Sequence, residues 1–149
     1  MKRLSILTAI VLVVILLALP AQVFATPPEE VVFTFEFYFT GPDSAAGSFA
    51  AEGAIADEGS GYEEFRYTDE GTLQGIKVLQ GTQGTITLRF NLEIIPTGPT
   101  TARTDVHFVI LSGTDAYENV HGVGTGAAVI DFAEGSLVGT FSGTVHIDP

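Results

Sequence analysis

Two segments of the chain, residues 31–40 and 85–95, alternate apolar and polar side chains so strictly that only an extended strand satisfies them. The first places every second residue on one apolar face, formed by Val31, Phe33, Phe35, Phe37 and Phe39. The second does the same with Ile86, Leu88, Phe90, Leu92 and Ile94. A period of two matches a strand, whereas a helix would scatter these residues around its circumference. Both segments therefore predict β-strands with one buried face.

Six further segments have the composition of short strands and are separated by turns rich in Gly, Asp, Ser and Pro. They are residues 47–55, 62–68, 72–80, 104–111, 123–132 and 137–147. No segment after residue 25 has a helical period, so the chain is expected to form an all-β sandwich or barrel. Most connections are too short to cross between two sheets. We therefore predict an antiparallel eight-stranded barrel in up-and-down meander order, which leaves no free edge.

The first 25 residues have the pattern of a secretory signal peptide. Lys2 and Arg3 precede an almost unbroken apolar run at residues 4–19, and small residues precede a cleavage site after Ala25. The run is shorter than the roughly 20 residues needed to cross a bilayer. The alternative is an uncleaved membrane anchor. We predict a signal peptide at residues 1–25, a single domain at 26–149 and a secreted, extracytoplasmic location.

The composition limits both the fold and its partners. The sequence contains no cysteine, so packing and strand pairing alone must stabilise the domain. Cleavage would remove Lys2 and Arg3 but none of the 18 acidic residues, which changes the net charge from −12 to −14. Such a surface repels nucleic acids and anionic membranes. We therefore expect no nucleic-acid partner and, after cleavage, no membrane partner.

The aromatic residues on the inward faces have two possible roles. An eight-stranded barrel is either filled by its side chains or wide enough to hold one small ligand. If it is filled, these residues form the core. If it is open, they line a cavity for a small apolar molecule, and the candidate lining residues are Phe33, Phe35, Phe37, Phe49, Tyr67, Phe90 and Phe108.

The polar residues do not form a recognisable catalytic or metal-binding motif. The three histidines, His107, His121 and His146, lack the spacing of a zinc site. Most acidic residues fall near expected turns, where solvation is the simplest interpretation; this group is Asp57, Glu58, Glu63, Glu64, Asp69 and Glu70. No serine lies in a Gly-x-Ser-x-Gly elbow. We therefore assign no catalytic residue from the sequence, and we predict no metal and no cofactor.

Residues 111–126 form a glycine-rich connection between two strongly β-patterned segments. Tyr117 is the aromatic residue in this stretch of small residues, and the glycines give it room. We expect its ring to fold back against the barrel end, with Val120 as a second anchor. The residues assigned to this structural motif are Gly113, Tyr117, Val120, Gly122 and Gly124.

Three segments resemble the allene oxide cyclase and dirigent superfamily, including its secreted bacterial relatives. Residues 112–124 are similar to its Gly-Thr-Gly-x-Tyr/Phe-x-x-x-x-Gly-x-Gly segment, although Asp115 replaces the second glycine. Residues 47–59 resemble an early hairpin, and residues 135–147 resemble the last strand. The resemblance implies an antiparallel eight-stranded barrel with an apolar cavity, often assembled as dimers or trimers. It transfers no catalytic residue to this chain.

These observations predict a secreted, non-enzymatic barrel that binds a small apolar molecule or serves a surface interaction. The alternative is an isomerase or cyclase that confines a lipid-like or phenolic substrate inside the barrel. A buried polar group in the interior would favour the enzyme. Val109 and Leu111 are expected on the outer face of the sixth predicted strand. In the seventh, Ala128, Ile130 and Phe132 add a second apolar set opposite Val123, Ala127 and Val129. This apolar outer patch further suggests a homo-oligomer that buries the outer faces of these two strands.

Overall fold

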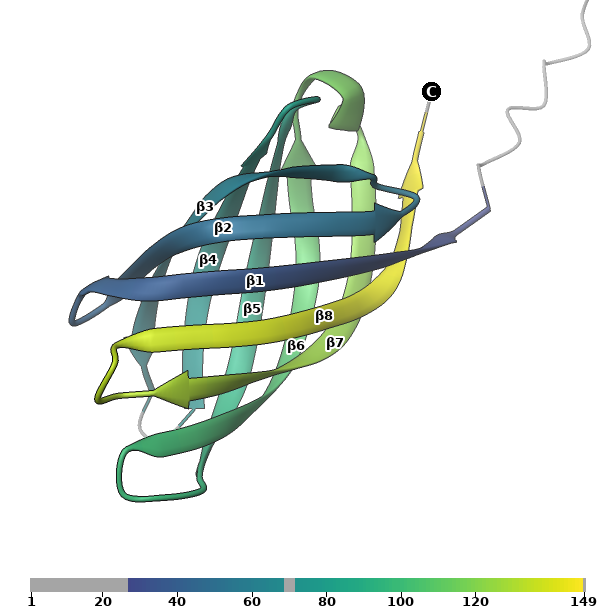
Figure 1. The fold of residues 1–149 in the computed structure, drawn as a ribbon. Helices are drawn as coiled ribbons and strands as arrows, with labels where there is room; N and C mark the ends of the chain where they lie inside the picture. Colours follow the sequence, from purple (N-terminus) through teal and green to yellow (C-terminus); the bar gives the residue numbers. More distant parts are fainter. Residues whose placement is uncertain (1–26, 69–71, 149) are drawn as a thin grey trace, which may run out of the picture.

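A computed structural model describes residues 27–68 and 72–148, which form a single β-barrel (Figure 1). The predicted signal peptide lies outside the described residues, as do Asp69 and Glu70. Within the described part, no helix is long and apolar enough to cross a bilayer. The strands are β1 Glu29–Gly41, β2 Ser44–Gly53, β3 Asp57–Tyr67, β4 Thr72–Gly81, β5 Thr85–Pro96, β6 Thr101–Gly113, β7 Val120–Asp131 and β8 Ser136–Ile147, with a 3₁₀ turn, η1 Asp115–Tyr117, between β6 and β7.

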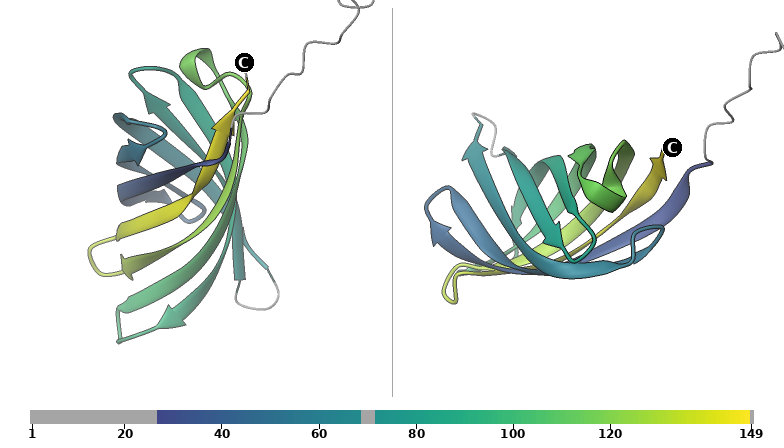
Figure 2. Two further views of the ribbon diagram at one scale, coloured as in Figure 1. Left: turned by 90° about the vertical axis from the view of Figure 1, so that its right-hand side faces the viewer. Right: turned by 90° about the horizontal axis from the view of Figure 1, so that it is seen from above.

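The eight strands form a closed antiparallel barrel in meander order, which confirms the predicted fold. Each strand pairs with its neighbours in sequence, and β1 closes the barrel by pairing with β8 (Figures 1 and 2). Phe35 lies at the centre of this closure, opposite Phe49 of β2 on one side and Gly139 of β8 on the other. All strand edges are therefore paired.

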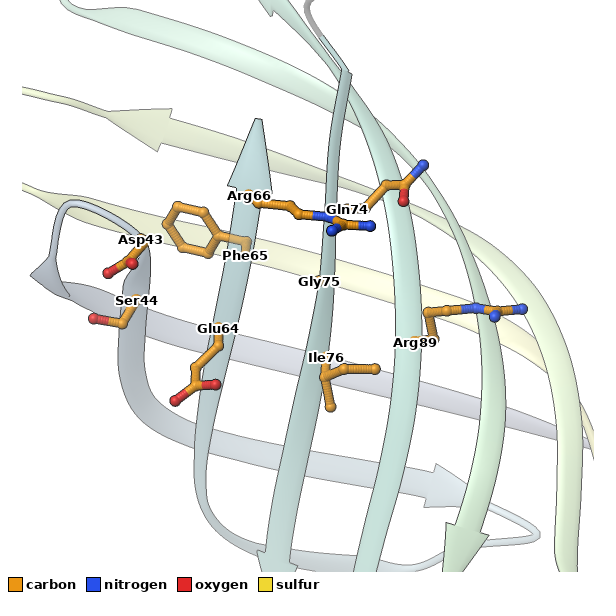
Figure 3. A pocket seen from close by; sticks show the side chains of 9 residues that line it. All are labelled: Asp43, Ser44, Glu64, Phe65, Arg66, Gln74, Gly75, Ile76 and Arg89. Atoms are coloured by element: carbon orange, nitrogen blue, oxygen red, sulfur yellow. The ribbon is translucent and has the colours of Figure 1, made fainter. Parts of the chain in front are cut away.

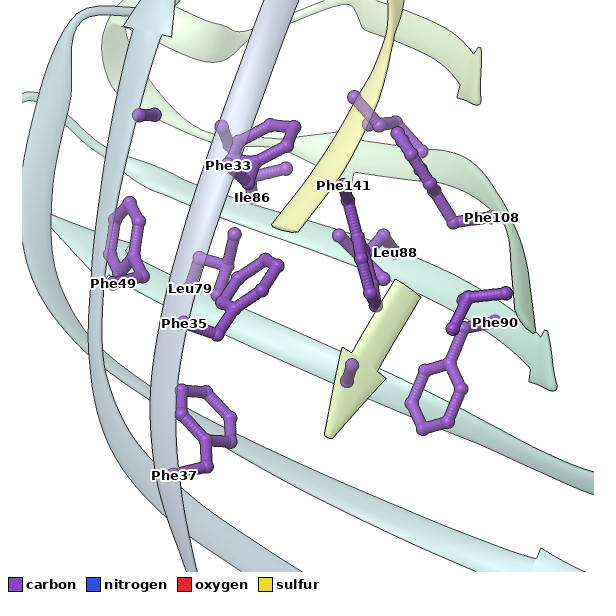
Figure 4. Close-up of a cluster of buried hydrophobic side chains, with 14 of the residues drawn as sticks. Phe33, Phe35, Phe37, Phe49, Leu79, Ile86, Leu88, Phe90, Phe108 and Phe141 are labelled. Carbon is purple, nitrogen blue, oxygen red and sulfur yellow. The ribbon is translucent and has the colours of Figure 1, made fainter. Parts of the chain in front are cut away.

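The alternating faces point into the barrel as the sequence predicts. Phe33, Phe37 and Phe90 are almost completely buried, and so are Ile86 and Leu88. The aromatic rings contact one another across the interior, with rings of β1 packed against rings of β6 and β8 (Figure 4). This cluster of rings and branched aliphatic side chains forms the core of the barrel.

Inward-facing glycines lie opposite the large rings on neighbouring strands. Gly124 of β7 pairs with Phe108 of β6, and a Cβ atom at Gly124 would lie 2.5 Å from the Phe108 ring. Gly75 of β4 has the same relation to Phe90 of β5, also at 2.5 Å. Any Cβ at these positions would clash with a buried ring. The glycines of β7 therefore make room for rings inside the barrel.

Several predicted strand boundaries are wrong because glycines were interpreted as turn residues. β3 begins at Asp57, whereas residues 57–61 were predicted to form a turn. Gly61 is in the strand, and its missing side chain leaves space for the Phe37 ring, which would lie 2.7 Å from an added Cβ. The predicted loop at residues 96–103 is also shorter, since pairing of β5 with β6 continues to Pro96 and Ala102.

The two ends of the barrel differ. At one end, η1 and the connection from β6 to β7 fold over the strands; this is the closed end (Figure 1). Asp115 has a φ of 56°, so it adopts the left-handed backbone conformation, which aspartate tolerates better than most residues other than glycine. The opposite end carries the short β1–β2, β5–β6 and β7–β8 connections and is called the mouth.

Candidate functional site

An ion pair lies inside the barrel. Glu63 of β3 and Lys77 of β4 are direct cross-strand partners, and Lys77 Nζ lies 3.1 Å from Glu63 Oε2. Their side chains are only 4% and 1% exposed. The expectation that Glu63 is solvated is therefore wrong. Glu63 lies on the same face of β3 as Gly61 and Phe65, and this face points inward.

Aromatic rings surround the Lys77 ammonium. Its Nζ lies 3.8 Å from the ring centroid of Phe35, 4.6 Å from that of Phe141 and 4.8 Å from that of Phe37. The negative faces of these rings attract a cation where water is excluded. Burial lowers the pKa of Lys77, while the charge and hydrogen bond of Glu63 oppose that change. A buried acid–base pair of this kind is a feature of many functional sites, although structural ion pairs also produce it.

The interior around this pair is filled rather than hollow. The apolar cavity found inside the strands is a pit of about 20 Å³ at the mouth, which is roughly the room that one water molecule needs. Six of the seven candidate lining residues are buried among other side chains: Phe33, Phe35, Phe37, Phe49, Phe90 and Phe108. Their packing fits the core-filling interpretation better than the cavity interpretation.

Tyr67, the seventh candidate, is not in the interior. It is the last residue of β3 and is 61% exposed, because the strand ends at the mouth, beyond the packed layers of rings. Its ring contacts the edge of Phe65, with the two centroids 6.3 Å apart. Tyr67 therefore belongs to the rim of the barrel.

Four aromatic side chains form this rim, which is called the aromatic mouth: Phe39, Phe65, Tyr67 and Phe132. Phe39 and Phe132 stack with their centroids 6.4 Å apart and their planes 5° apart, yet Phe132 remains 49% exposed. Phe39 also contacts Phe65 edge to face. The pit opens between these rings, and Glu63 forms part of its wall. The mouth thus joins an exposed apolar rim to one member of the buried ion pair.

The closed end is sealed by a hydrogen-bonded network around Asp57. Tyr117 Oη donates to Asp57 Oδ2 at 2.8 Å. Thr82 donates to Oδ1 through both its backbone N–H and its hydroxyl group, and the Gln83 N–H donates to Oδ2. Asp57 is therefore buried rather than solvated, which corrects the sequence-based expectation.

The network fixes the protonation states of both groups. Burial alone would raise the pKa of Asp57, but the hydrogen bonds from Thr82, Gln83 and Tyr117 outweigh it and hold the pKa well below its usual range. The pKa of Tyr117 is raised by burial and by the neighbouring Asp57 carboxylate. Tyr117 therefore remains a neutral donor to an ionised acceptor.

The residues of the predicted structural motif surround this seal. Tyr117 and Val120 are both buried in the core. Gly113 lies directly against the backbone oxygen and the Cβ atom of Tyr117, so a side chain at Gly113 would displace Tyr117. Gly122 and Gly124 lie further along β7, facing inward. The structure assigns these five residues to the closed end and the adjoining interior.

The outer surface carries an open groove of about 560 Å³ over β3, β4 and β5 (Figure 3). Arg66 and Arg89 line it, together with Glu64 and Asp43. In Figure 3, Arg66 extends toward Gln74. Arg89 lies beyond Ile76 and extends away from Arg66. The charged groups are mixed in sign and do not converge, so the groove presents no defined site.

No metal-binding group of three or more His, Cys, Asp or Glu side chains occurs among residues 27–68 and 72–148. His107 faces outward on β6, whereas His121 of β7 and His146 of β8 are cross-strand partners. Comparison of the chain with protein-family models, curated proteins and solved structures found no match. The resemblance to the allene oxide cyclase and dirigent superfamily therefore stays a prediction.

The sequence carries part of the signal for the ion pair. Leu73, Gly75 and Leu79 mark one face of β4, and Lys77 has the same parity. A lysine on an inward face requires an acidic partner, and Glu63 has inward parity on the adjacent strand. The missing information was the register that places the two residues opposite each other.

We predict that the two single variants of the ion pair are much less stable than the double variant. Lys77→Met or Glu63→Gln leaves one buried charge without its partner and should cost about 3–5 kcal/mol of unfolding free energy. Lys77→Met combined with Glu63→Leu removes both charges and should be within about 2 kcal/mol of the original protein or more stable. Urea denaturation measures all three. Equal losses in the single and double variants would contradict the pairing.

A second prediction concerns Asp57 and pH. A carboxyl group whose pKa is lower in the folded state stabilises the fold above its unfolded pKa of about 4, and this contribution is lost as the pH falls toward the folded value. Asp57→Asn should therefore lower the melting temperature at pH 7. The difference from the original protein should shrink as the pH is lowered to about 2.5.

Asp131→Asn is the matched control for this measurement, because Asp131 accepts hydrogen bonds only from the exposed turn at residues 133–134. It should change the melting temperature much less than Asp57→Asn. A difference for Asp57→Asn that is independent of pH would show that its hydrogen bonds do not depend on ionisation.

Proposed function

We propose that this protein is a secreted, non-enzymatic barrel that binds a small apolar molecule at its aromatic mouth. The observation that carries the proposal is the exposure of Tyr67 and Phe132 around an apolar pit at one end of the barrel. Exposed aromatic rings around a hollow are typical of a ligand-binding surface. The other end is sealed by Tyr117 and Asp57, so a ligand would enter only from the mouth.

The packed interior limits the type of ligand. A pit of about 20 Å³ admits no more than a small apolar tip, so most of the ligand would lie across the rim. Tyr67 and Phe132 would then cover a flat apolar or aromatic group, in the way that rings stack on each other. The net charge of −12 disfavours an anionic ligand and favours a neutral or cationic one.

The second candidate function is an isomerase or cyclase acting on a lipid-like or phenolic substrate inside the barrel. The buried Glu63–Lys77 pair supports it, since it places an acid and a base together below the pit. The packed rings above and around the pair weigh against it, because the substrate would have to displace them. The double variant Lys77→Met/Glu63→Leu would abolish such catalysis, whereas binding across the exposed rings of Tyr67 and Phe132 should persist, because neither ring is altered.

We also propose that two copies of the chain associate through the outer faces of β6 and β7, with β8 extending the contact. Val123 and Val129 of β7 and Val138 of β8 are exposed there, next to Val109 of β6, whereas Ala128 and Ile130 of β7 are buried. The outward residues from Val123 to Val129 and from Val138 to Thr144 include no carboxylate, and Asp105 on the outer face of β6 is paired with Arg103. In a chain with 18 acidic residues, this neutral face is where two copies can approach with least repulsion.

The ligand proposal predicts that N-phenyl-1-naphthylamine, a neutral fluorescent probe, binds saturably with one site per barrel. Phe132→Ser should weaken this binding about tenfold, because it removes a ring of which about half is exposed and available to cover the probe. Tyr62→Ser is the matched control, since Tyr62 is a similarly exposed ring that faces outward from the middle of β3 and does not line the pit. Absence of saturable binding, or equal effects of the two variants, would refute the proposed site.

The assembly proposal predicts a dimer or larger oligomer in light scattering at micromolar concentration. Salt should strengthen the association by screening the negative charges. Val123→Glu should shift the protein to monomer by placing a carboxylate at the centre of the neutral face. A monomer at both low and high salt would contradict the proposal.

A further inference from the structure

His121 and His146 form a cross-strand pair on the outer surface near the closed end. They are direct partners in the β7–β8 register. Their ring centroids lie 5.4 Å apart, and the ring planes are inclined by 35°. Neither side chain is part of the mouth or of the ion pair. The two imidazoles are held side by side by regular strand pairing and do not depend on a loop.

This separation matches the geometry of a metal chelate. In a tetrahedral zinc site with Zn–N distances of about 2.0–2.1 Å, two imidazole centroids lie roughly 5.2 Å apart. The observed 5.4 Å is within a few tenths of an ångström of that value. Small side-chain rotations would therefore bring one nitrogen of each ring onto a single ion without moving the backbone.

Solvent can reach the histidine pair. His121 is exposed and His146 is half-buried on the outer face of β7 and β8, so water molecules can complete the coordination of an ion held between the two rings. Imidazole nitrogens select zinc and neighbouring transition metals over Mg²⁺ and Ca²⁺, which prefer oxygen ligands.

We propose that His121 and His146 form a two-histidine site for Zn²⁺ on the outer face of β7 and β8. The site goes beyond the proposed ligand-binding function and does not depend on it. The pair has no sequence motif that would reveal it. The two ligands are 25 positions apart in sequence and meet only through the β7–β8 hairpin.

Calorimetric titration of the purified protein with Zn²⁺, in the presence of millimolar Mg²⁺ to occupy surface carboxylates, tests the proposal. We expect one Zn²⁺ per chain. His121→Gln and His146→Gln should each weaken binding about tenfold or more, since even loss of an outer-shell partner of a metal ligand has effects of that size. His107→Gln is the matched control, because His107 is an exposed histidine on the outer face of the adjacent strand β6.

Nuclear magnetic resonance of the histidine rings provides a second measurement. Added Zn²⁺ should shift the ring signals of His121 and His146 together and leave those of His107 unchanged, and a chelator should reverse the shift. No saturable binding, or an equal loss of affinity in all three variants, would overturn the proposal.

Discussion

The structure depends on the limited space inside an eight-stranded barrel. Rings from β1, β5, β6 and β8 fill that space, and each needs a small residue opposite it on a neighbouring strand. Gly124 opposite Phe108 and Gly75 opposite Phe90 are the clearest cases. A larger residue at either glycine would force a buried ring out of place, at a cost typical of overpacked cores. The inward glycines opposite these rings are thus a consequence of the phenylalanines that fill the barrel.

The buried Glu63–Lys77 pair adds specificity to this packing. Hydrophobic contacts alone tolerate several registers, because sliding a strand by two residues keeps the same face inside. Such a slip between β3 and β4 would separate Lys77 from Glu63 and leave two unpaired charges in the core. The desolvation of unpaired charges is expensive, so the ion pair excludes alternative registers even if it adds little stability. The Asp57–Tyr117 network does the same for the closed end.

The fold was predictable from the sequence because its strands alternate strictly and its turns are short. Phe33, Phe35 and Phe37 could be placed inside by parity alone. The candidate site was less predictable, since Glu63 and Lys77 become partners only once the β3–β4 register is known. Asp57 was misinterpreted because an Asp-Glu-Gly sequence is typical of turns, whereas here it begins a strand. The filled interior could not be predicted, because it depends on the sum of side-chain volumes across all eight strands.

Closure between β1 and β8 has a consequence for how the chain acquires its structure. Glu29 pairs with Val145, so residues near the two ends of the domain must meet before the last two free edges, those of β1 and β8, are covered. Contacts of such wide sequence separation form slowly, and they cannot form on a ribosome until the last strand has emerged. Until then the barrel is incomplete. The proposed secretion fits this delay, because an unfinished barrel can still be threaded through a narrow export channel.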